Sequence, residues 1–208
     1  MSEKQQAKQH WETVYATKST DAVSWFQPQA ETSLKLIQAT GAAPTDAVID
    51  VGGGASTLVD GLLANGFANV SVLDLSGAAL AASRARLGEQ AAAVQWLEAD
   101  ITQVALPAQR YAVWHDRAVF HFLVEAEDRT AYRNLLLNAL QPNGQVIIAT
   151  FAENGPTQCS GLPIRRYSAE ALHAELGESF ELVDSHTEAH RTPSGAIQQF
   201  VYVHLRRV

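Results

Sequence analysis

The sequence contains a single cysteine, Cys159, among its 208 residues. One cysteine excludes a disulfide within the chain and any zinc site built from several cysteines, as is typical of a reducing compartment. The sequence also lacks an apolar run approaching the roughly 20 residues needed to cross a bilayer. Residues 1–10 are polar, and the apolar segment of a secretory signal does not follow them. We therefore expect a cytoplasmic protein with no membrane partner.

Excess positive charge is missing as well. The chain carries 15 Lys and Arg residues against 22 Asp and Glu residues, which gives a formal net charge of −7. Nucleic-acid binding depends largely on basic side chains that neutralise phosphates, so a nucleic-acid partner is not expected. Internal repeats and long linkers are absent too, and a chain of this length suits one compact core. We predict one domain spanning residues 1–208; the oligomeric state stays open.

The sequence does contain β-branched segments that alternate with segments of helical periodicity. The expected strands are residues 46–51, 69–74, 94–97, 111–115, 145–151, 180–188 and 198–205. The expected helices are residues 56–65, 77–87 with Ser76 as N-cap, and 129–140, which a turn at 141–144 ends. The last two strands are joined only by a turn at 192–195, so they form a hairpin. We predict a three-layer α/β/α, Rossmann-like fold, with a mostly parallel seven-stranded sheet and an antiparallel C-terminal hairpin strand.

A glycine loop follows the first expected strand, in residues 48–56 (VIDVGGGAS). A strand that ends in glycines and opens a helix presents backbone N–H groups and the positive end of the helix dipole to a ligand. This arrangement serves nucleotide cofactors generally. The dinucleotide fingerprint would require a third glycine at Thr57, and the G-K-[ST] of a phosphate-binding loop is absent.

Three acidic residues are spaced around this loop. Asp74 ends the second strand, where it can accept hydrogen bonds from two ribose hydroxyls. Asp100 follows the third strand, beside the next part of such a ligand. Asp50, two residues before the first glycine, can face an ammonium group. Two plainer readings stay open, namely that Asp74 only caps a helix and that Asp100 is a solvated loop residue.

On these motifs the chain resembles the class I S-adenosylmethionine-dependent methyltransferases over nearly its whole length. The matching segments are residues 50–56 (DVGGGAS), 72–76 (VLDLS), 99–101 (ADI) and 140–144 (LQPNG). The resemblance implies that Asp50 lies near the methionine amino group of S-adenosylmethionine, that Asp74 binds the ribose, and that Asp100 binds the adenine amino group. It implies no metal. The cofactor-binding residues expected are Trp11, Tyr15, Trp25, Asp50, Gly52, Gly53, Gly54, Ser56, Asp74, Leu75, Asp100, Ile101, Asp116 and Arg117.

The N-terminal residues 10–15 (HWETVY) and 23–26 (VSWF) are similar to the W-x-x-x-Y…W-F opening of a methyltransferase-like subgroup that includes protein lysine methyltransferases. We expect residues 1–40 to form a helical lid, residues 46–151 the cofactor-binding core, and residues 152–208 an acceptor loop and the hairpin. The family often has D-K-G-x-x-D after the fourth strand, whereas this chain has Asp116-Arg-Ala-Val-Phe-His121. That difference leaves the substrate class open.

Methyl transfer from a sulfonium is an in-line displacement, so the protein mainly aligns the acceptor and excludes water. A general base is needed only for a protonated acceptor, and the candidates are His115, Asp116 and His121. No third ligand accompanies the two histidines at a spacing suited to a metal. The candidates for acceptor binding are His121, Cys159, Arg165 and Arg166.

The sequence thus predicts a methyltransferase that uses S-adenosylmethionine, with S-adenosylhomocysteine as product, and acts on a small-molecule or protein side-chain acceptor. Two alternatives remain. One is a nucleotide-dependent oxidoreductase of doubly wound fold, and the other is a non-catalytic module that binds the cofactor with the same fold.

Overall fold

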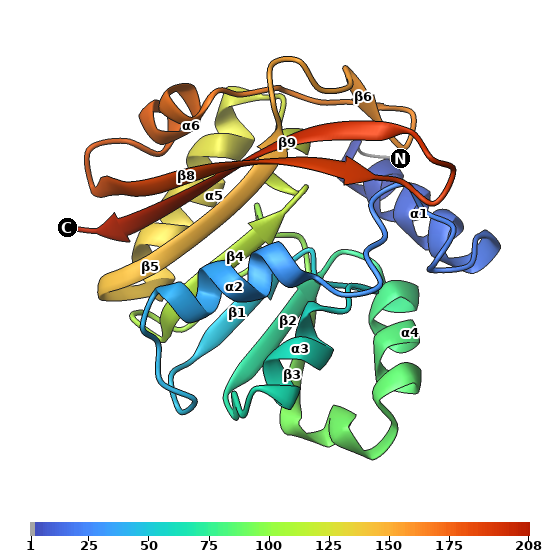
Figure 1. The fold of residues 1–208 in the computed structure, drawn as a ribbon, viewed down its shortest axis with the longest axis horizontal. Helices are drawn as coiled ribbons and strands as arrows, with labels where there is room; N and C mark the ends of the chain where they lie inside the picture. The colour runs from blue at the N-terminus through green and yellow to red at the C-terminus, as the bar shows by residue number, and fades with distance from the viewer. Residues whose placement is uncertain (1–2) are drawn as a thin grey trace.

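The computed structural model describes residues 3–208, and one seven-stranded sheet lies at its centre (Figure 1). The strands are ordered β3-β2-β1-β4-β5-β9-β8. Their bounds are β1 (Val48–Val51), β2 (Val70–Asp74), β3 (Val94–Glu98), β4 (Tyr111–Arg117), β5 (Leu140–Phe151), β8 (Phe180–Arg191) and β9 (Ile197–Arg207). Neighbouring strands among β1 to β5 pair in parallel, while β9 is antiparallel to both β5 and β8. The predicted fold, with its antiparallel C-terminal hairpin strand, is confirmed.

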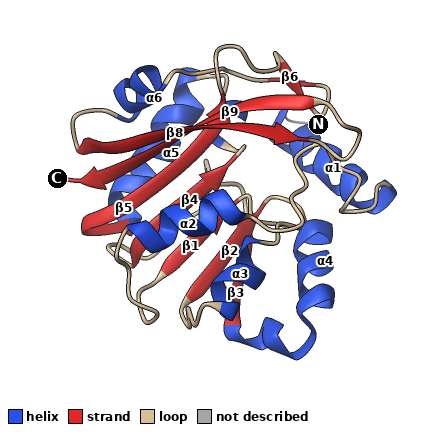
Figure 2. Cartoon of the chain, in the orientation of Figure 1, coloured by secondary structure: helices blue, strands red, loops and turns tan. Residues whose placement is uncertain are grey.

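Helices cover both faces of this sheet, which gives three layers (Figure 2). On one face, α2 (Glu31–Ala39), α3 (Leu58–Ala64) and α4 (Gly77–Leu87) add apolar side chains to the core. On the other face, α5 (Ala126–Ala139) and α6 (Ala169–Leu176) do the same. Strands β1 and β2 are buried along their whole length. Covering on both faces explains why these strands are nearly continuous apolar segments in the sequence.

Five further elements lie outside the main layers. Helix α1 (Glu3–Thr17) packs beside α4, and two 3₁₀ helices are η1 (Gly88–Ala93) and η2 (Phe120–Phe122). The segment after β5 contains a small hairpin of β6 (Gln158–Cys159) and β7 (Leu162–Pro163). Along residues 3–208, no helix is both long enough and apolar enough to span a membrane.

The helix at 77–87 and its cap were predicted correctly, since the Ser76 hydroxyl accepts a hydrogen bond from the Ala79 N–H. The helix predicted at 129–140 starts earlier, at Ala126. The turn expected at 141–144 is wrong as a separate element, because Leu140 already pairs with Tyr111 and the segment forms an irregularity inside β5. Of the residues 1–40 proposed as a lid, residues 1–2 lie outside the described part of the chain. Within residues 3–40, α2 packs on the sheet through Ile37, while α1 and Trp25 line the larger cavity described below. The division into lid, core and acceptor loop stays a prediction.

Candidate functional site

The glycine loop connects β1 to α3 and is shaped by close packing. Gly52 has a φ of +71°, and a Cβ atom there would collide with Val119. A Cβ on Gly53 would meet the Asp50 carboxylate, and a Cβ on Gly54 would meet the Asp74 carboxylate and lie 2.8 Å from the Ala79 Cβ. The last two glycines therefore make room for the chain's own acidic side chains.

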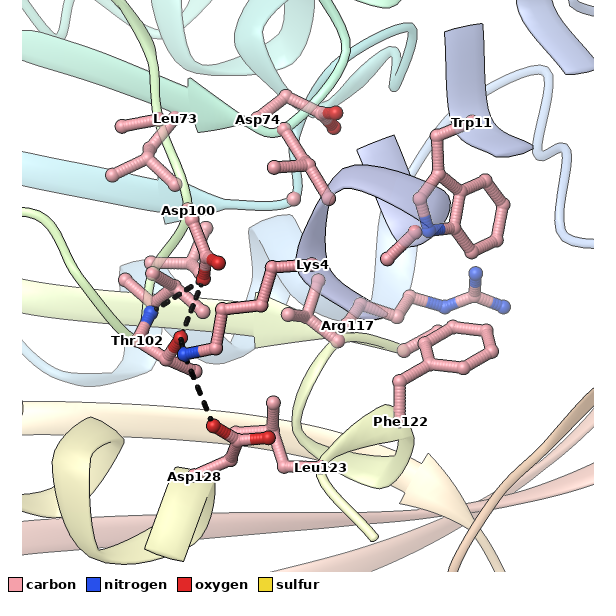
Figure 3. A pocket seen from close by; sticks show the side chains of 18 of the residues that line it. Lys4, Trp11, Leu73, Asp74, Asp100, Thr102, Arg117, Phe122, Leu123 and Asp128 are labelled. Atoms are coloured by element: carbon pink, nitrogen blue, oxygen red, sulfur yellow. Dashed lines mark hydrogen bonds and ion pairs between the residues drawn. The ribbon is translucent and has the colours of Figure 1, made fainter. Parts of the chain in front are cut away.

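A cavity of about 280 Å³ opens beside this loop, at the carboxyl ends of the parallel strands. In open α/β sheets, ligands bind at this edge. One side of the cavity, which we call the strand end, is lined by Gly52, Asp74, Leu75, Asp100 and Ile101. Figure 3 shows Asp74 and Asp100 near each other there, with Lys4 and Thr102 close by. Five of the predicted cofactor-binding residues thus come together at the strand end.

The carboxylates of the strand end are held by hydrogen bonds from their own loops. The Ser76 N–H donates to Asp74 Oδ1 at 2.8 Å, and the Thr102 N–H and hydroxyl donate to Asp100 Oδ1 at 2.8 and 2.7 Å. Burial, with smaller contributions from the charges of Asp50 and Glu12, raises the pKa of Asp74 to about 7 against the opposing effect of backbone N–H groups. Asp74 is therefore a titrating carboxyl near neutral pH.

A smaller cavity of about 50 Å³ adjoins the first, and Tyr15, Trp25, Gly52 and Arg117 line both. Asp50, Gly53 and Ser56 line the smaller one. His115 Nδ1 lies 2.7 Å from Asp50 Oδ1, and His115 Nε2 lies 2.9 Å from the Ser33 hydroxyl. Among the described residues, the buried Asp50 Oδ2 has no hydrogen-bond partner. A buried carboxylate oxygen without a donor is costly, so this atom fits a positively charged ligand group.

The other side of the larger cavity, which we call the aromatic end, is lined by Trp11, Tyr15, Trp25, Phe122 and Cys159. Trp11 makes edge-to-face contacts with Trp25 and Phe122, at centroid distances of 5.6 and 5.2 Å. The Trp25 indole N–H donates to the Tyr15 hydroxyl at 3.2 Å. The predicted association of Trp11, Tyr15 and Trp25 is observed; Phe26 lines the smaller cavity only.

Helix α1 lies across this cavity and is tied down by residues that the sequence analysis missed. Glu12 accepts hydrogen bonds from the Gly77 and Ala78 N–H groups at the start of α4, and from the Ser76 hydroxyl. Lys4 donates to the Thr102 hydroxyl and forms an ion pair with Asp128 at 3.3 Å (Figure 3). Lys8 pairs with Glu98 at 2.5 Å. The partners of Glu12 lie more than 60 residues away in the chain, so no local pattern predicts its hydrogen bonds to α4. The one signal for Glu12 in the sequence is its position inside the W-x-x-x-Y motif.

The candidate bases occupy different places. His115 lines the smaller cavity, where it binds Asp50. Asp116 points to the opposite face of the sheet, where it accepts hydrogen bonds from the Tyr132 hydroxyl and the Val119 and Phe120 N–H groups. Burial raises its pKa to about 6. The structure therefore places Asp116 away from both cavities, although the sequence suggested a base or a cofactor contact.

His121 is fully buried beside Phe122 and Phe151, outside the linings of both cavities. Burial and the charge of Arg117 lower its pKa to about 3, so the imidazole is neutral. Within the part of the chain that the structure describes, no three His, Cys, Asp or Glu side chains cluster as a metal site would require.

Of the three acceptor-binding candidates that follow β5, one lines a cavity and two do not. Cys159 lines the aromatic end, and burial raises the pKa of its thiol to about 12. Arg165 and Arg166 are exposed, and they contact Glu175 and the Gly155 carbonyl instead of lining a cavity. Their distance from the cavities does not support the predicted role in acceptor binding.

Arg117 is the charged residue shared by the two cavities. Its Nε donates to the Tyr202 hydroxyl at 2.9 Å, its Nη1 donates to the Trp25 carbonyl at 3.1 Å, and its guanidinium lies 4.3 Å from the Phe200 ring centroid. Glu188 forms an ion pair with Nη2 at 3.6 Å. This buried cation therefore joins β4, the C-terminal hairpin and the Trp25 segment beside the aromatic end.

Residues 48–144 match the family model of a methyltransferase domain, while a comparison with curated proteins gives no match. The fold resembles a structure solved for the conversion of a disulfide bond into a thioacetal group during echinomycin biosynthesis; the TM-score is 0.78 at 18% identity, over 97% of this chain and 92% of that one. It resembles a SAM-dependent methyltransferase from Anabaena variabilis, with a TM-score of 0.73 at 16% identity over 100% and 96%. It also resembles 1,6-didemethyltoxoflavin-N1-methyltransferase from Burkholderia thailandensis, solved with 1,6-didemethyltoxoflavin and S-adenosylhomocysteine, with a TM-score of 0.71 at 19% identity over 100% and 92%.

The family match covers the glycine loop and the strand ends that carry Asp74 and Asp100. Residues 48–144 thus match a methyltransferase domain, and the chain as a whole has the Rossmann-like fold of solved SAM-dependent methyltransferases.

Proposed function

We propose that this protein binds S-adenosylmethionine across the two cavities and transfers its methyl group to a small molecule held at the aromatic end. The observation that carries the proposal is the buried Oδ2 atom of Asp50. This atom lacks a donor among residues 3–208, and Asp50 is one of the residues that line the smaller cavity. A methionine ammonium group supplies the positive donor that this atom needs, whereas a pyrophosphate does not.

The residues at the strand end would hold the rest of the cofactor. Asp74 accepts the ribose hydroxyls, Asp100 accepts from the adenine amino group, and Leu75 and Ile101 line the adenine site. When bound, S-adenosylmethionine supplies an electrophilic methyl group and a neutral leaving group. Thr57 stands where the dinucleotide fingerprint has its third glycine, and its hydroxyl already donates to the Gln27 carbonyl at 3.0 Å. That contact argues against the oxidoreductase alternative.

The acceptor is proposed to be a small molecule because α1 lies across the cavity and is held at Lys4, Lys8 and Glu12. A protein side chain would have to enter past these contacts. One similar structure concerns a step of echinomycin biosynthesis, and another is a methyltransferase with bound 1,6-didemethyltoxoflavin, which supports a small-molecule acceptor here.

The charge beside the aromatic end favours a neutral or anionic acceptor. Arg117 lines the cavity there, and the Cys159 thiol stays protonated. A lysine ammonium would meet a buried guanidinium, so a protein lysine is disfavoured. The chain's own contribution is to align the acceptor between aromatic rings and to exclude water. His115 is engaged by Asp50 and His121 lies outside the cavities, so the acceptor is proposed to arrive with its lone pair free.

Calorimetry with S-adenosylhomocysteine and NAD tests the cofactor. Micromolar binding of the first with none of the second is expected, and the reverse result would overturn the proposal. Labelled S-adenosylmethionine is then incubated with the protein and either the low-molecular-mass or the protein fraction of a cell extract. Label should enter the low-molecular-mass fraction. Label confined to proteins would contradict the acceptor class, and label in neither fraction would favour the non-catalytic module.

A further inference from the structure

The smaller cavity contains a linear chain of three buried side chains, Asp50, His115 and Ser33. Asp50 on β1 and His115 on β4 are register partners on adjacent parallel strands, so their side chains share one face of the sheet. Ser33 on α2 reaches the far nitrogen of the imidazole. All three are at most 2% exposed, and all three line the cavity.

The hydrogen bonds of this chain determine which imidazole nitrogen carries the proton. An ionised carboxylate only accepts, so His115 Nδ1 donates to Asp50 Oδ1 at 2.7 Å. Nε2 lies 2.9 Å from the Ser33 hydroxyl, which donates to it when the ring carries its proton on Nδ1 alone. Asp50 Oδ1 is thereby occupied, while Oδ2, next to Gly53, has no donor among the described residues.

We infer that His115 and Ser33 are positioning residues that hold one oxygen of Asp50 so that the other is presented to the ammonium group of the cofactor. This inference rests on the proposed function, because it assigns Asp50 to the methionine end of S-adenosylmethionine. The physical analogy is the carboxylate that orients a metal-binding histidine, where loss of the outer partner lowers affinity without removing the ligand itself.

The same three residue types, in this order, also form the orienting carboxylate, the base and the nucleophile of serine hydrolases. The size of the cavity separates the two readings here. At about 50 Å³, the cavity that Ser33 lines is far smaller than a typical small-molecule site, so it has room for an ammonium group but not for an acyl substrate. A positioning role requires only the contacts that are observed.

Binding of two ligands distinguishes a role of His115 in positioning Asp50 from a role in packing the protein core. S-adenosylhomocysteine carries the amino-acid group, whereas 5′-methylthioadenosine lacks it but keeps the adenosine. The full-length protein is titrated with both by calorimetry. His115→Leu removes the donor at similar volume, and it should weaken S-adenosylhomocysteine binding about 10- to 100-fold while changing 5′-methylthioadenosine binding by less than about twofold.

His115→Asn provides the rescue, because its carboxamide N–H can replace Nδ1–H. It should recover most of the preference for S-adenosylhomocysteine. His204→Leu is the matched control, since it removes another buried histidine, hydrogen bonded to Gln145 between β5 and β9, and should leave both affinities unchanged. Nitrogen-15 correlation spectra should show His115 protonated at Nδ1 in the wild type.

Several outcomes overturn the inference. Equal weakening of both ligands by His115→Leu would make the histidine a packing residue, and so would an Asn variant no better than Leu. Labelling of Ser33 by a fluorophosphonate would show a reactive nucleophile. If the Leu variant does not fold, Ser33→Ala is titrated with the same two ligands. Its affinity for S-adenosylhomocysteine should fall a few-fold, while its affinity for 5′-methylthioadenosine should not change. Failure of the wild type to bind S-adenosylhomocysteine would instead overturn the proposed function.

Discussion

The two ends of the main cavity are built in different ways. At the strand end, Asp74 is the last residue of β2 and Asp100 lies two residues after β3. Each carboxylate is held by the N–H group two residues further along the chain, from Ser76 and Thr102. At the aromatic end, the wall comes from α1, the Trp25 segment, η2 and the loop after β5, and its members touch each other across more than 100 residues. The strand end is a rigid property of the sheet, whereas the aromatic end exists only after distant segments have packed. We therefore expect the strand end to determine the affinity for the cofactor and the aromatic end to determine which acceptor is bound.

Asp74→Asn should have the largest effect and would test whether the strand end dominates. The variant keeps the volume but removes the charge that the ribose hydroxyls are proposed to meet, at a cost of about 2–3 kcal/mol, or roughly a hundredfold in Kd. Calorimetry with S-adenosylhomocysteine measures this loss. Asp184→Asn, on the exposed part of β8, is the matched control and should bind like the wild type. An unchanged Kd for Asp74→Asn would move the ribose elsewhere.

The pH dependence of S-adenosylhomocysteine binding follows from the carboxyl group of Asp74. Its pKa is raised to about 7, so below that value the free protein carries a protonated Asp74 and must release the proton to bind hydroxyl donors. Affinity for S-adenosylhomocysteine should therefore rise about tenfold from pH 6 to pH 8, with protons released on binding. Titrations in buffers of different ionisation enthalpy count these protons. The Asp74→Asn variant should lose this part of the pH dependence.

Gly54→Ala should have the next largest effect. The added Cβ would meet the Asp74 carboxylate and Ala79, so the carboxylate must shift. We expect about 1–3 kcal/mol of lost stability and roughly tenfold weaker binding, measured by urea unfolding and calorimetry. Gly61→Ala is the control, because its nearest neighbour is the flexible tip of Leu34 at 3.2 Å and the position lies within α3. Normal binding by Gly54→Ala would mean that the loop relaxes and the strand end is less rigid than argued.

Removing residues 1–17 tests the contribution of α1 and so of the aromatic end. The deletion takes away Trp11, Tyr15 and the Glu12 carboxylate that binds the start of α4. Binding of S-adenosylhomocysteine should weaken about fivefold to tenfold, which is the scale of one lost helix cap. Circular dichroism and hydrogen exchange of β1 and β4 should show that the sheet persists. Affinity equal to that of the full chain would remove α1 from the cofactor site.

Glu12→Gln should have the smallest effect and would show whether the two ends are coupled. The charge of Glu12 raises the pKa of Asp74, so its removal should lower the pH midpoint of binding by about a few tenths of a unit. Glu31→Gln, at the start of α2, is the control because it pairs with the exposed Lys35. A midpoint that does not move would mean that α1 and the strand end act independently.

Most of the strand end could be predicted because its signals are local. The glycines, Asp50, Asp74 and Asp100 each follow a short apolar segment, and parallel strands bring such ends to one edge. The Ser76 cap was equally readable, since a cap involves residues three apart. Asp116 shows the limit of this reasoning. Asp116 comes directly after His115, the residue that pairs with Asp50 in the sheet. Side chains alternate between the two faces along β4, so that of Asp116 points to Tyr132 on the other face.

The sequence by itself determined the order of strands and helices, the glycine loop and the spacing of the acids, because these depend on periodicity and on neighbours in the chain. Only the tertiary structure decided that Glu12 caps α4, that Arg117 pairs with Tyr202 and Glu188, and that Ser33 reaches His115. Those contacts join residues 65 to 85 positions apart. No local pattern in the sequence marks them, since any other acid, arginine or serine in the chain would look the same. The glycine loop therefore predicted a cofactor, while the packing around it determined how one carboxylate oxygen was left without a donor.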